Sequence, residues 1–159
     1  MLTIRNYQMQ KWTLILVLSF VFLFGQDNRL RLKKADVLER ITVDCKAFQY
    51  LKGNVVFQKG EMTMNCDWAR FNQKNEQGFL FGNVSMVKNE QNLTCDSLFV
   101  DSPKNIMIAY SNTQVWDTTY SLITDTLFYF SELDSGSANG NATLVQDKQT
   151  IKGDRIEYI

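Results

Sequence analysis

Two short motifs recur along this sequence at one constant interval, which limits the folds that the chain can adopt. The first is Gly-Asn-Val or a close variant, and its copies begin at Gly53, Gly82, Ser111 and Gly140. The second is an aspartate that follows a small residue, and its copies are Asp67, Asp96, Asp125 and Asp154. Every step in both series is 29 residues long. Such an interval predicts stacked supersecondary units, none of which can bury its apolar face alone.

Side chains around the first motif alternate between apolar and polar. In the first copy the apolar positions are Leu51, Val55 and Phe57, and Gly53 falls on the same face. This alternation predicts a β-strand with one buried face. We expect the glycine to mark a narrow place in the core, where a facing backbone or a ligand comes close.

The alternation of apolar residues shifts by one position at each aspartate. Met64 and Cys66 lie at odd offsets before Asp67, whereas Ala69 and Phe71 lie at even offsets after it. A strand that changes its buried face at one point must be bulged or bent there. We interpret the aspartates as corner residues that accept hydrogen bonds from local backbone N–H groups, not as catalytic acids.

An earlier copy of the aspartate motif lies near the start of the domain, at Asp36, which is 31 residues before Asp67. Terminal repeats are often atypical because they cap the stack. We therefore expect the segment around Asp36 to form the first corner.

The N-terminal segment has the features of a secretory signal peptide. Arg5 and Lys11 precede an apolar run, residues 12–24, and Gly25 follows it. This run is shorter than the roughly 20 residues that span a bilayer as a helix. The sequence predicts a cleaved signal peptide over residues 1–25 and one domain over residues 26–159, with an uncleaved anchor as the alternative.

Composition excludes several classes of function. Lys plus Arg and Asp plus Glu both total 17, so no basic surface for nucleic acid is expected. The chain has no histidine, which removes Ser-His and Cys-His catalysis and histidine-ligated zinc, and it has no glycine-rich phosphate loop. Its single proline and many β-branched and aromatic residues predict an all-β domain. We expect no catalytic residues, no cofactor and no metal.

Cys66 and Cys95 occupy the same phase of neighbouring repeats. If their strands are adjacent, a disulfide can bridge them, and Cys45 remains as a free thiol. Export to an oxidising compartment permits this bond. The alternative is a pair of buried thiols in a β core.

The last residues of the sequence predict an open sheet edge. Residues 150–159 are β-prone, contain no proline and carry charges of alternating sign. Such an edge pairs with a partner strand or with a continuation of the chain beyond Ile159. We expect head-to-tail association with the N-terminal edge, near residues 30–38, of another copy.

These phased motifs, together with the opening Ala35-Asp36-Val37-Leu38, resemble the OstA-like (LptA) family of lipopolysaccharide-transport proteins. The Cys-Asp corners are similar to OstA-like proteins of Bacteroidetes-type Gram-negative bacteria. The resemblance implies a twisted β-jelly-roll of stacked antiparallel strands whose apolar inner groove carries lipid A acyl chains across the periplasm. It also implies lipopolysaccharide and other jelly-roll components of the transport bridge as partners, with association with the outer membrane as a further option.

The inward-facing apolar positions of the repeats are the predicted lining of the groove: Leu51, Val55, Phe57, Met64, Leu80, Val84, Met86, Leu93, Val115, Leu122, Leu144 and Ile151. Lys88, in a neighbouring turn, is expected to lie outside it. From the pattern alone these residues fit either a filled core or a slot for alkyl chains. Two other functions compete with lipid transport. The chain could be a structural β-stack without lipid binding, or the periplasmic part of a larger outer-membrane translocon component.

Overall fold

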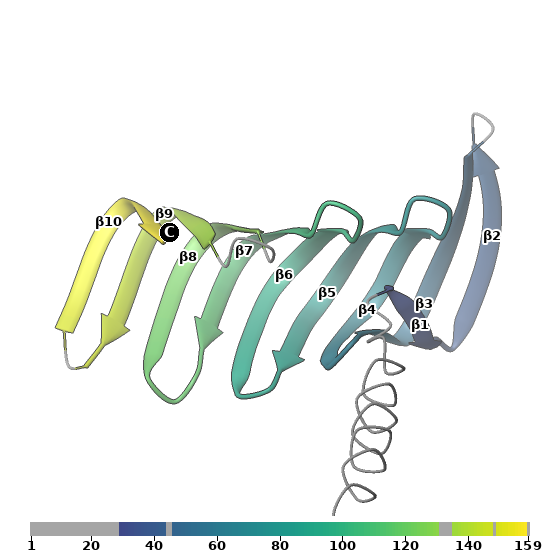
Figure 1. The fold of residues 1–159 in the computed structure, drawn as a ribbon. Helices are drawn as coiled ribbons and strands as arrows, with labels where there is room; N and C mark the ends of the chain where they lie inside the picture. The colour runs from purple at the N-terminus through teal and green to yellow at the C-terminus, as the bar shows by residue number, and fades with distance from the viewer. Residues whose placement is uncertain (1–28, 44–45, 131–134, 148, 159) are drawn as a thin grey trace, which may run out of the picture.

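A computed structural model describes residues 29–43, 46–130, 135–147 and 149–158, which form one antiparallel sheet of ten strands (Figure 1). The strands are β1 (Arg31–Lys34), β2 (Val37–Val43), β3 (Lys46–Lys59), β4 (Met62–Asn72), β5 (Gln77–Lys88), β6 (Gln91–Asp101), β7 (Ile106–Trp116), β8 (Tyr120–Phe130), β9 (Ser135–Gln146) and β10 (Gln149–Tyr158). The prediction of an all-β fold of stacked antiparallel strands is confirmed. The predicted signal peptide, residues 1–25, lies outside the described residues.

From β3 to β10 each strand pairs with the next strand along the chain, which gives the long row in Figure 1. The two short strands β1 and β2 both pair with β3. β1 pairs near Gln58, and β2 pairs with residues 46–52. Asp36 lies between them, and its backbone N–H donates to the carbonyl oxygen of Gly53 at 2.9 Å. β1 and β2 therefore act as one bent strand with Asp36 at its corner.

The strand pairs share a bulge at the two sequence motifs. In the pairing of β4 with β5 the register shifts between Asn65 and Trp68, where Gly82 and Asn83 lie on the opposite strand. Gly82 and Asn83 both have left-handed backbones, with φ of 72° and 46°. Bulges of this kind bend a strand and redirect its side chains. The bend occurs where the apolar phase changes in the sequence.

Because each strand bends, the sheet has two halves that face each other. The rings of Phe57 and Phe71 lie at opposite ends of the β3–β4 pair, yet their centroids are 5.3 Å apart. Lys59, the last residue of β3, reaches the loop between β6 and β7, where its Nζ donates to Asn105 Oδ1 at 3.0 Å. The apolar faces of both halves therefore enclose a single interior.

The neighbours of the corner residues differ from those expected. A Cβ atom on Gly82 would lie 2.5 Å from Oδ2 of Asp67, so the glycine makes room for the corner aspartate rather than for a backbone or ligand across the core. That carboxylate accepts a hydrogen bond of 2.8 Å from the side-chain amide of Asn83. Its partner is thus a side chain on the following strand and not a local backbone N–H group.

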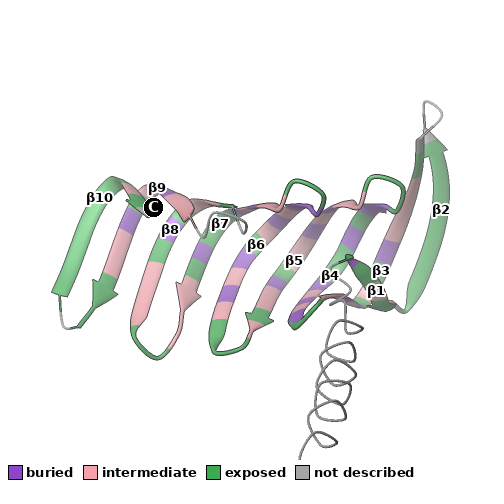
Figure 2. Ribbon diagram, in the orientation of Figure 1, coloured by how far each residue is buried: buried purple, intermediate pink, exposed green. Residues whose placement is uncertain are grey.

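Burial is uneven along the row of strands (Figure 2). The interior between β3 and β6 is filled by apolar side chains that are almost completely inaccessible, namely Leu51, Val55, Phe57, Met64, Leu80, Val84, Leu98 and Val100. In contrast, β8 and β9 carry mainly half-buried side chains, and β10 is largely exposed. The molecule therefore has a sealed N-terminal part and a more open C-terminal part.

The two described cysteines are not bonded to each other. Cys66 lies on β4 and Cys95 on β6, and both are free, buried thiols. β5 runs between these strands, so the two Cα atoms are about two strand spacings, or 9.6 Å, apart, beyond the roughly 6.8 Å that a disulfide spans. The alternative of two buried thiols is correct for this pair. Cys45 lies outside the described residues.

Candidate functional site

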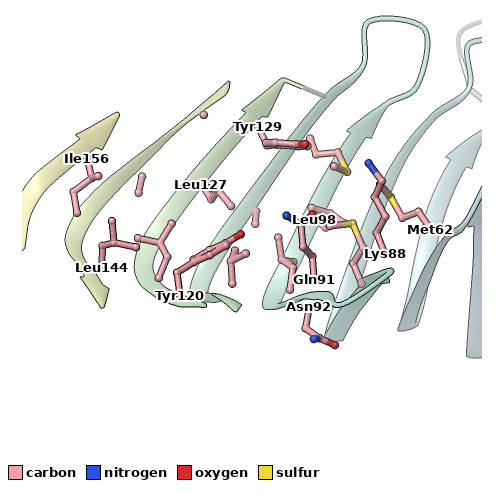
Figure 3. Close-up of a pocket in the computed structure, with 18 of the residues that line it drawn as sticks. Met62, Lys88, Gln91, Asn92, Leu98, Tyr120, Leu127, Tyr129, Leu144 and Ile156 are labelled. Atoms are coloured by element: carbon pink, nitrogen blue, oxygen red, sulfur yellow. The ribbon is translucent and has the colours of Figure 1, made fainter. Parts of the chain in front are cut away.

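The open part of the interior forms a cavity of about 350 Å³ between the two halves of the sheet (Figure 3). Met62 and Lys88 lie at one end of the view and Leu144 and Ile156 at the other, so the cavity runs along the row of strands. Its lining residues are Met62, Met86, Lys88, Gln91, Asn92, Leu93, Leu98, Met107, Ala109, Val115, Tyr120, Leu122, Leu127, Tyr129, Gly136, Ala138, Leu144, Gln146 and Ile156.

Two rows of directly paired apolar residues form the walls. The first row, which we call the lower rail, lies on β5 to β9 and consists of Met86, Leu93, Val115, Leu122 and Leu144. The upper rail lies on β6 to β10 and consists of Leu98, Ala109, Leu127, Ala138 and Ile156. Each rail arises because apolar residues at equal phases of successive repeats become cross-strand neighbours. The two rails give the cavity continuous hydrocarbon walls.

Polar side chains gather where the lower rail meets the turns. Lys88 pairs with Gln91 across the β5–β6 hairpin, and Tyr120 pairs with Gln146 across the β8–β9 pair. Lys88 is the charged residue of the lining, and it is half-buried. Within the described ranges, no cluster of side chains could hold a metal ion. The site therefore suits a molecule with an apolar body and an anionic or polar head.

One end of the interior is closed by three contacts. Leu30 is buried in the core, and Leu32 and Ala35 pack against it beside β3. Lys59 bridges the two halves by donating to Asn105 and, at 3.4 Å, to the carbonyl oxygen of Ser102. The cavity begins beyond this bridge and continues toward β10.

The predicted groove residues fall into three groups in the structure. Met86, Leu93, Val115, Leu122 and Leu144 line the cavity. Leu51, Val55, Phe57, Met64, Leu80 and Val84 belong to the filled interior, where their side chains are at most 1% exposed. Ile151 pairs with Leu144 but is 54% exposed.

Several lining residues were not among those expected. Lys88, which the sequence pattern placed outside the groove, is part of the lining. The whole upper rail was also missed, although its members lie two residues after an aspartate or two before the glycine position, where the apolar phase could have identified them. No helix among the described residues is long and apolar enough to cross a membrane.

The fold is similar to that of a solved periplasmic protein. LptH from Pseudomonas aeruginosa, described as the LptA homologous periplasmic component of the conserved lipopolysaccharide transport device, superimposes with a TM-score of 0.63. The alignment covers 73% of this chain and 87% of LptH at 12% sequence identity. At this identity the similarity shows the fold alone.

None of the curated proteins matches the sequence of this chain. The family described as OstA-like protein matches residues 27–158, which includes every strand of the structure. The chain therefore belongs to the family of OstA-like proteins.

Proposed function

We propose that this protein is a periplasmic component of lipopolysaccharide transport and that its cavity holds the lipid A acyl chains during passage to the outer membrane. Membership of the OstA-like family and the fold shared with LptH support this proposal. The observation that carries it is the pair of apolar rails, which enclose an elongated cavity between the two halves of the sheet.

The dimensions of the rails favour an alkyl chain over a compact ligand. The lower rail crosses five strands, from β5 to β9, and so extends for about 19 Å at roughly 4.8 Å per strand. Each methylene group that leaves water for such a wall contributes about 0.8 kcal/mol. An acyl chain that lies along the rails therefore gains more from burial than a small rounded molecule at one end.

The rim supplies a complementary contact for the head of the lipid. Lys88 lines the cavity beside Gln91 and Asn92, and the phosphates of lipopolysaccharide are anionic. A lysine ammonium binds phosphate as a point charge without fixed geometry. Lys88 thus suits a head group that must leave the site again during transport.

Export belongs to the same proposal. The charged and apolar segments of residues 1–25 would direct the chain across the inner membrane, and residues 26–159 would act in the periplasm. Other jelly-roll components of the transport bridge are the partners that we propose for the sheet edges.

The test uses two neighbouring residues on β8 that face opposite sides of the sheet. Leu122 belongs to the lower rail, whereas Ile123 is 51% exposed. A photo-crosslinking amino acid at position 122 should capture lipopolysaccharide when the purified protein is loaded and irradiated. The same amino acid at position 123 should capture little.

Matched substitutions provide a second measurement. Leu122→Asp places an unpaired carboxylate against hydrocarbon, which costs several kcal/mol, and should abolish lipopolysaccharide uptake. Ile123→Asp should leave uptake within about twofold of the wild type because its side chain faces solvent. Equal effects of the two substitutions, or no lipid captured at position 122, would instead favour a structural β-stack without lipid binding.

A further inference from the structure

A second hollow, which we call the outer hollow, lies beside the hairpin that joins β7 to β8. Its volume is about 420 Å³, and it is open to solvent. Its lining includes Trp116, Ser121 and Val145 and the turn residues Asp117 and Asp147. Trp116 pairs with Ser121, and Ser121 pairs with Val145. These three residues are sequence neighbours of the lower rail, so they lie on the opposite, outer face of the sheet.

The β7–β8 hairpin departs from the other repeats at Trp116 and Asp117. The equivalent positions, at steps of 29 residues, hold Gln58, Val87 and Val145 for the first and Lys59, Lys88 and Gln146 for the second. The hairpins of the stack therefore form without a tryptophan or an aspartate at these two places. We look for the role of Trp116 and Asp117 outside the packing of the sheet.

Local hydrogen bonds hold the carboxylate of Asp117 in place. Its Oδ1 accepts from the backbone N–H of Thr119 at 2.6 Å, from the hydroxyl of Thr119 at 2.8 Å and from the backbone N–H of Tyr120 at 3.0 Å. The hydrogen bond from the backbone of Thr119 lowers the pKa of Asp117, so the group is ionised at neutral pH. None of the three bonds uses Oδ2, which leaves this oxygen as a positioned acceptor beside the outer hollow.

The indole of Trp116 borders unfilled space. Its cross-strand neighbours are Asn92 on β6 and the short Ser121 on β8, and the stacked ring pairs of the described residues do not include it. Beyond Ser121 the next residue of this row is Val145 on β9. The small side chain of Ser121 thus leaves room for a ligand between the indole and Val145.

This combination of groups suits a sugar ring. The C–H groups of a pyranose are weakly positive and pack against the electron-rich face of an aromatic ring, while its hydroxyl groups donate to carboxylate oxygens. The volume lies in the range of small-molecule sites, and the open form admits one ring of a longer saccharide. The charged residues of the described lining, Asp117 and Asp147, are acidic and disfavour a phosphate; Lys148 lies outside the described residues.

The outer hollow adjoins the cavity. Tyr120 and Gln146 line both spaces. The β5–β6 hairpin, which carries Lys88, lies at the same edge of the sheet as the β7–β8 hairpin (Figure 1). The two hairpins are two strand spacings, or about 10 Å, apart. One amphiphilic molecule can therefore reach the cavity, Lys88 and the outer hollow together.

We propose that the outer hollow binds a sugar ring, which packs against Trp116 and donates a hydroxyl hydrogen bond to Asp117 Oδ2. The sugar belongs to the saccharide part of the molecule whose acyl chains occupy the cavity, so the inference rests on the proposed function and adds a second site to it. Lys88 then contacts the phosphates, and the β7–β8 hairpin contacts the saccharide.

The test follows the indole N–H signals of the tryptophans in two-dimensional NMR spectra of the purified protein. The probe is lipopolysaccharide from which all acyl chains have been removed by hydrolysis, so that it has no alkyl chain for the cavity. We expect a saturable shift of the Trp116 signal. The signal of Trp68, which is stacked on Phe81 elsewhere on the sheet, should stay in place. Inorganic phosphate at the same concentration should move neither signal.

Three substitutions test the contacts, with binding measured by saturation transfer from the protein to the saccharide. Trp116→Val introduces the residue found at two equivalent positions, so the hairpin should fold, and binding should weaken at least about tenfold. Asp117→Asn keeps Oδ1 for the turn but loses the charged acceptor, and should weaken binding about five- to tenfold. Trp68→Phe keeps an aromatic ring beside Phe81 and should leave the affinity unchanged.

Three results would overturn the proposal: no saturable shift of the Trp116 signal, an equal shift with inorganic phosphate, or a Trp116→Val variant that binds the saccharide as tightly as the wild type. Photo-crosslinking at position 122 reports on the acyl chains alone. Lipid capture there without a shift of Trp116 would refute only the sugar site, and a shift without lipid capture would refute only the binding of acyl chains in the cavity.

Discussion

Cys66, Cys95 and Thr124 occupy one inward-facing position on the alternate strands β4, β6 and β8. The hydroxyl of Thr124 donates to the carbonyl oxygens of Asn139 and Gly140 at 2.9 and 3.1 Å, and thereby satisfies backbone acceptors at the bulge of the next strand. The thiol of Cys95 donates instead to the carbonyl oxygen of its neighbour Ser97 at 3.2 Å. The position therefore accepts a small side chain with a polar hydrogen.

The ionisation of these thiols should lower the free energy of unfolding of the protein at alkaline pH. Burial raises the pKa of Cys66 from 9.0 to about 11 and the pKa of Cys95 to about 12. In the unfolded chain both thiols ionise near pH 9, whereas in the folded chain they keep their protons to higher pH. Their contribution to stability is complete below pH 9 and is lost as the pH rises toward 11 and 12.

Replacing both cysteines by threonine, the residue found at the equivalent position 124, tests whether the thiols cause this loss of stability at alkaline pH. Cys66→Thr with Cys95→Thr should give a folded protein, since Thr124 is accommodated at the equivalent place. Between pH 9 and 11 the free energy of unfolding, measured by chemical denaturation, should fall less steeply for the double variant than for the wild type. Parallel curves for the two proteins would show that the thiols do not titrate differently in the two states.

At the scale of the strand, the bend at each corner could be predicted from the sequence, but the hydrogen-bond partner of the corner aspartate could not. The change of apolar phase at Asp67 identified the bend, because a strand has only two faces and the hydrophobic pattern must follow whichever face is inside. The partner of Asp67 remained hidden, since the contact joins residues on different strands and depends on their register. The doublet Gly82-Asn83 was nevertheless a usable signal, because these two residue types are the ones that most readily adopt left-handed backbones.

The extent of the cavity was less predictable than the position of the strands. Val84 and Leu122 both face the interior in the apolar pattern, but Val84 is completely buried while Leu122 lines open space. Alternation tells which side of a strand a residue is on, not how far away the facing half of the sheet lies. That distance depends on the sizes of all the side chains between the halves, such as the close pair Phe57 and Phe71 in the filled part.

Two glycines on β5 allow the bend itself to be tested. Gly82→Ala forces a side chain into a backbone with φ of 72° and into contact with Asp67, so we expect a loss of about 1 to 3 kcal/mol in the free energy of unfolding. Gly78→Ala is the control, because its added Cβ would meet neighbours only at 3.4 Å or more and its backbone is not left-handed. That substitution should change stability by less than about 1 kcal/mol.

A double variant separates the two causes of the expected loss. Asp67→Ala removes both the close contact and the hydrogen bond from Asn83, so in this background Gly82→Ala should cost less stability than in the wild type, because only the backbone strain remains. If urea denaturation shows the same small loss in the free energy of unfolding for Gly82→Ala as for Gly78→Ala, the left-handed backbone does not require glycine at position 82.

At the scale of the whole molecule, stability should fall along the row of strands. The buried side chains concentrate on β3 to β6, while β7 to β10 face the cavity, whose lining begins with Met62 on β4 and Met86 on β5. In stacked architectures each unit is stabilised by its neighbours, and weakly packed units open first. The more open part is therefore the part in which a ligand can replace missing side-chain contacts.

Hydrogen exchange of backbone amides gives the measurement, and β4 and β8 give the fairest comparison because both pair with a strand on each side. β4 packs against filled core and β8 against the cavity, so we expect amides of β8 to exchange at least about tenfold faster, in line with a difference of 1.4 kcal/mol or more in the free energy of local opening. Lipopolysaccharide should slow exchange in β8 and leave β4 nearly unchanged, because a bound ligand stabilises only the segments whose opening releases it. In the Leu122→Asp variant this slowing should disappear. Equal exchange in the two strands without lipid would mean that the cavity does not loosen the C-terminal half. Equal protection of both strands with lipid would mean that the acyl chains do not bind at β8 in particular.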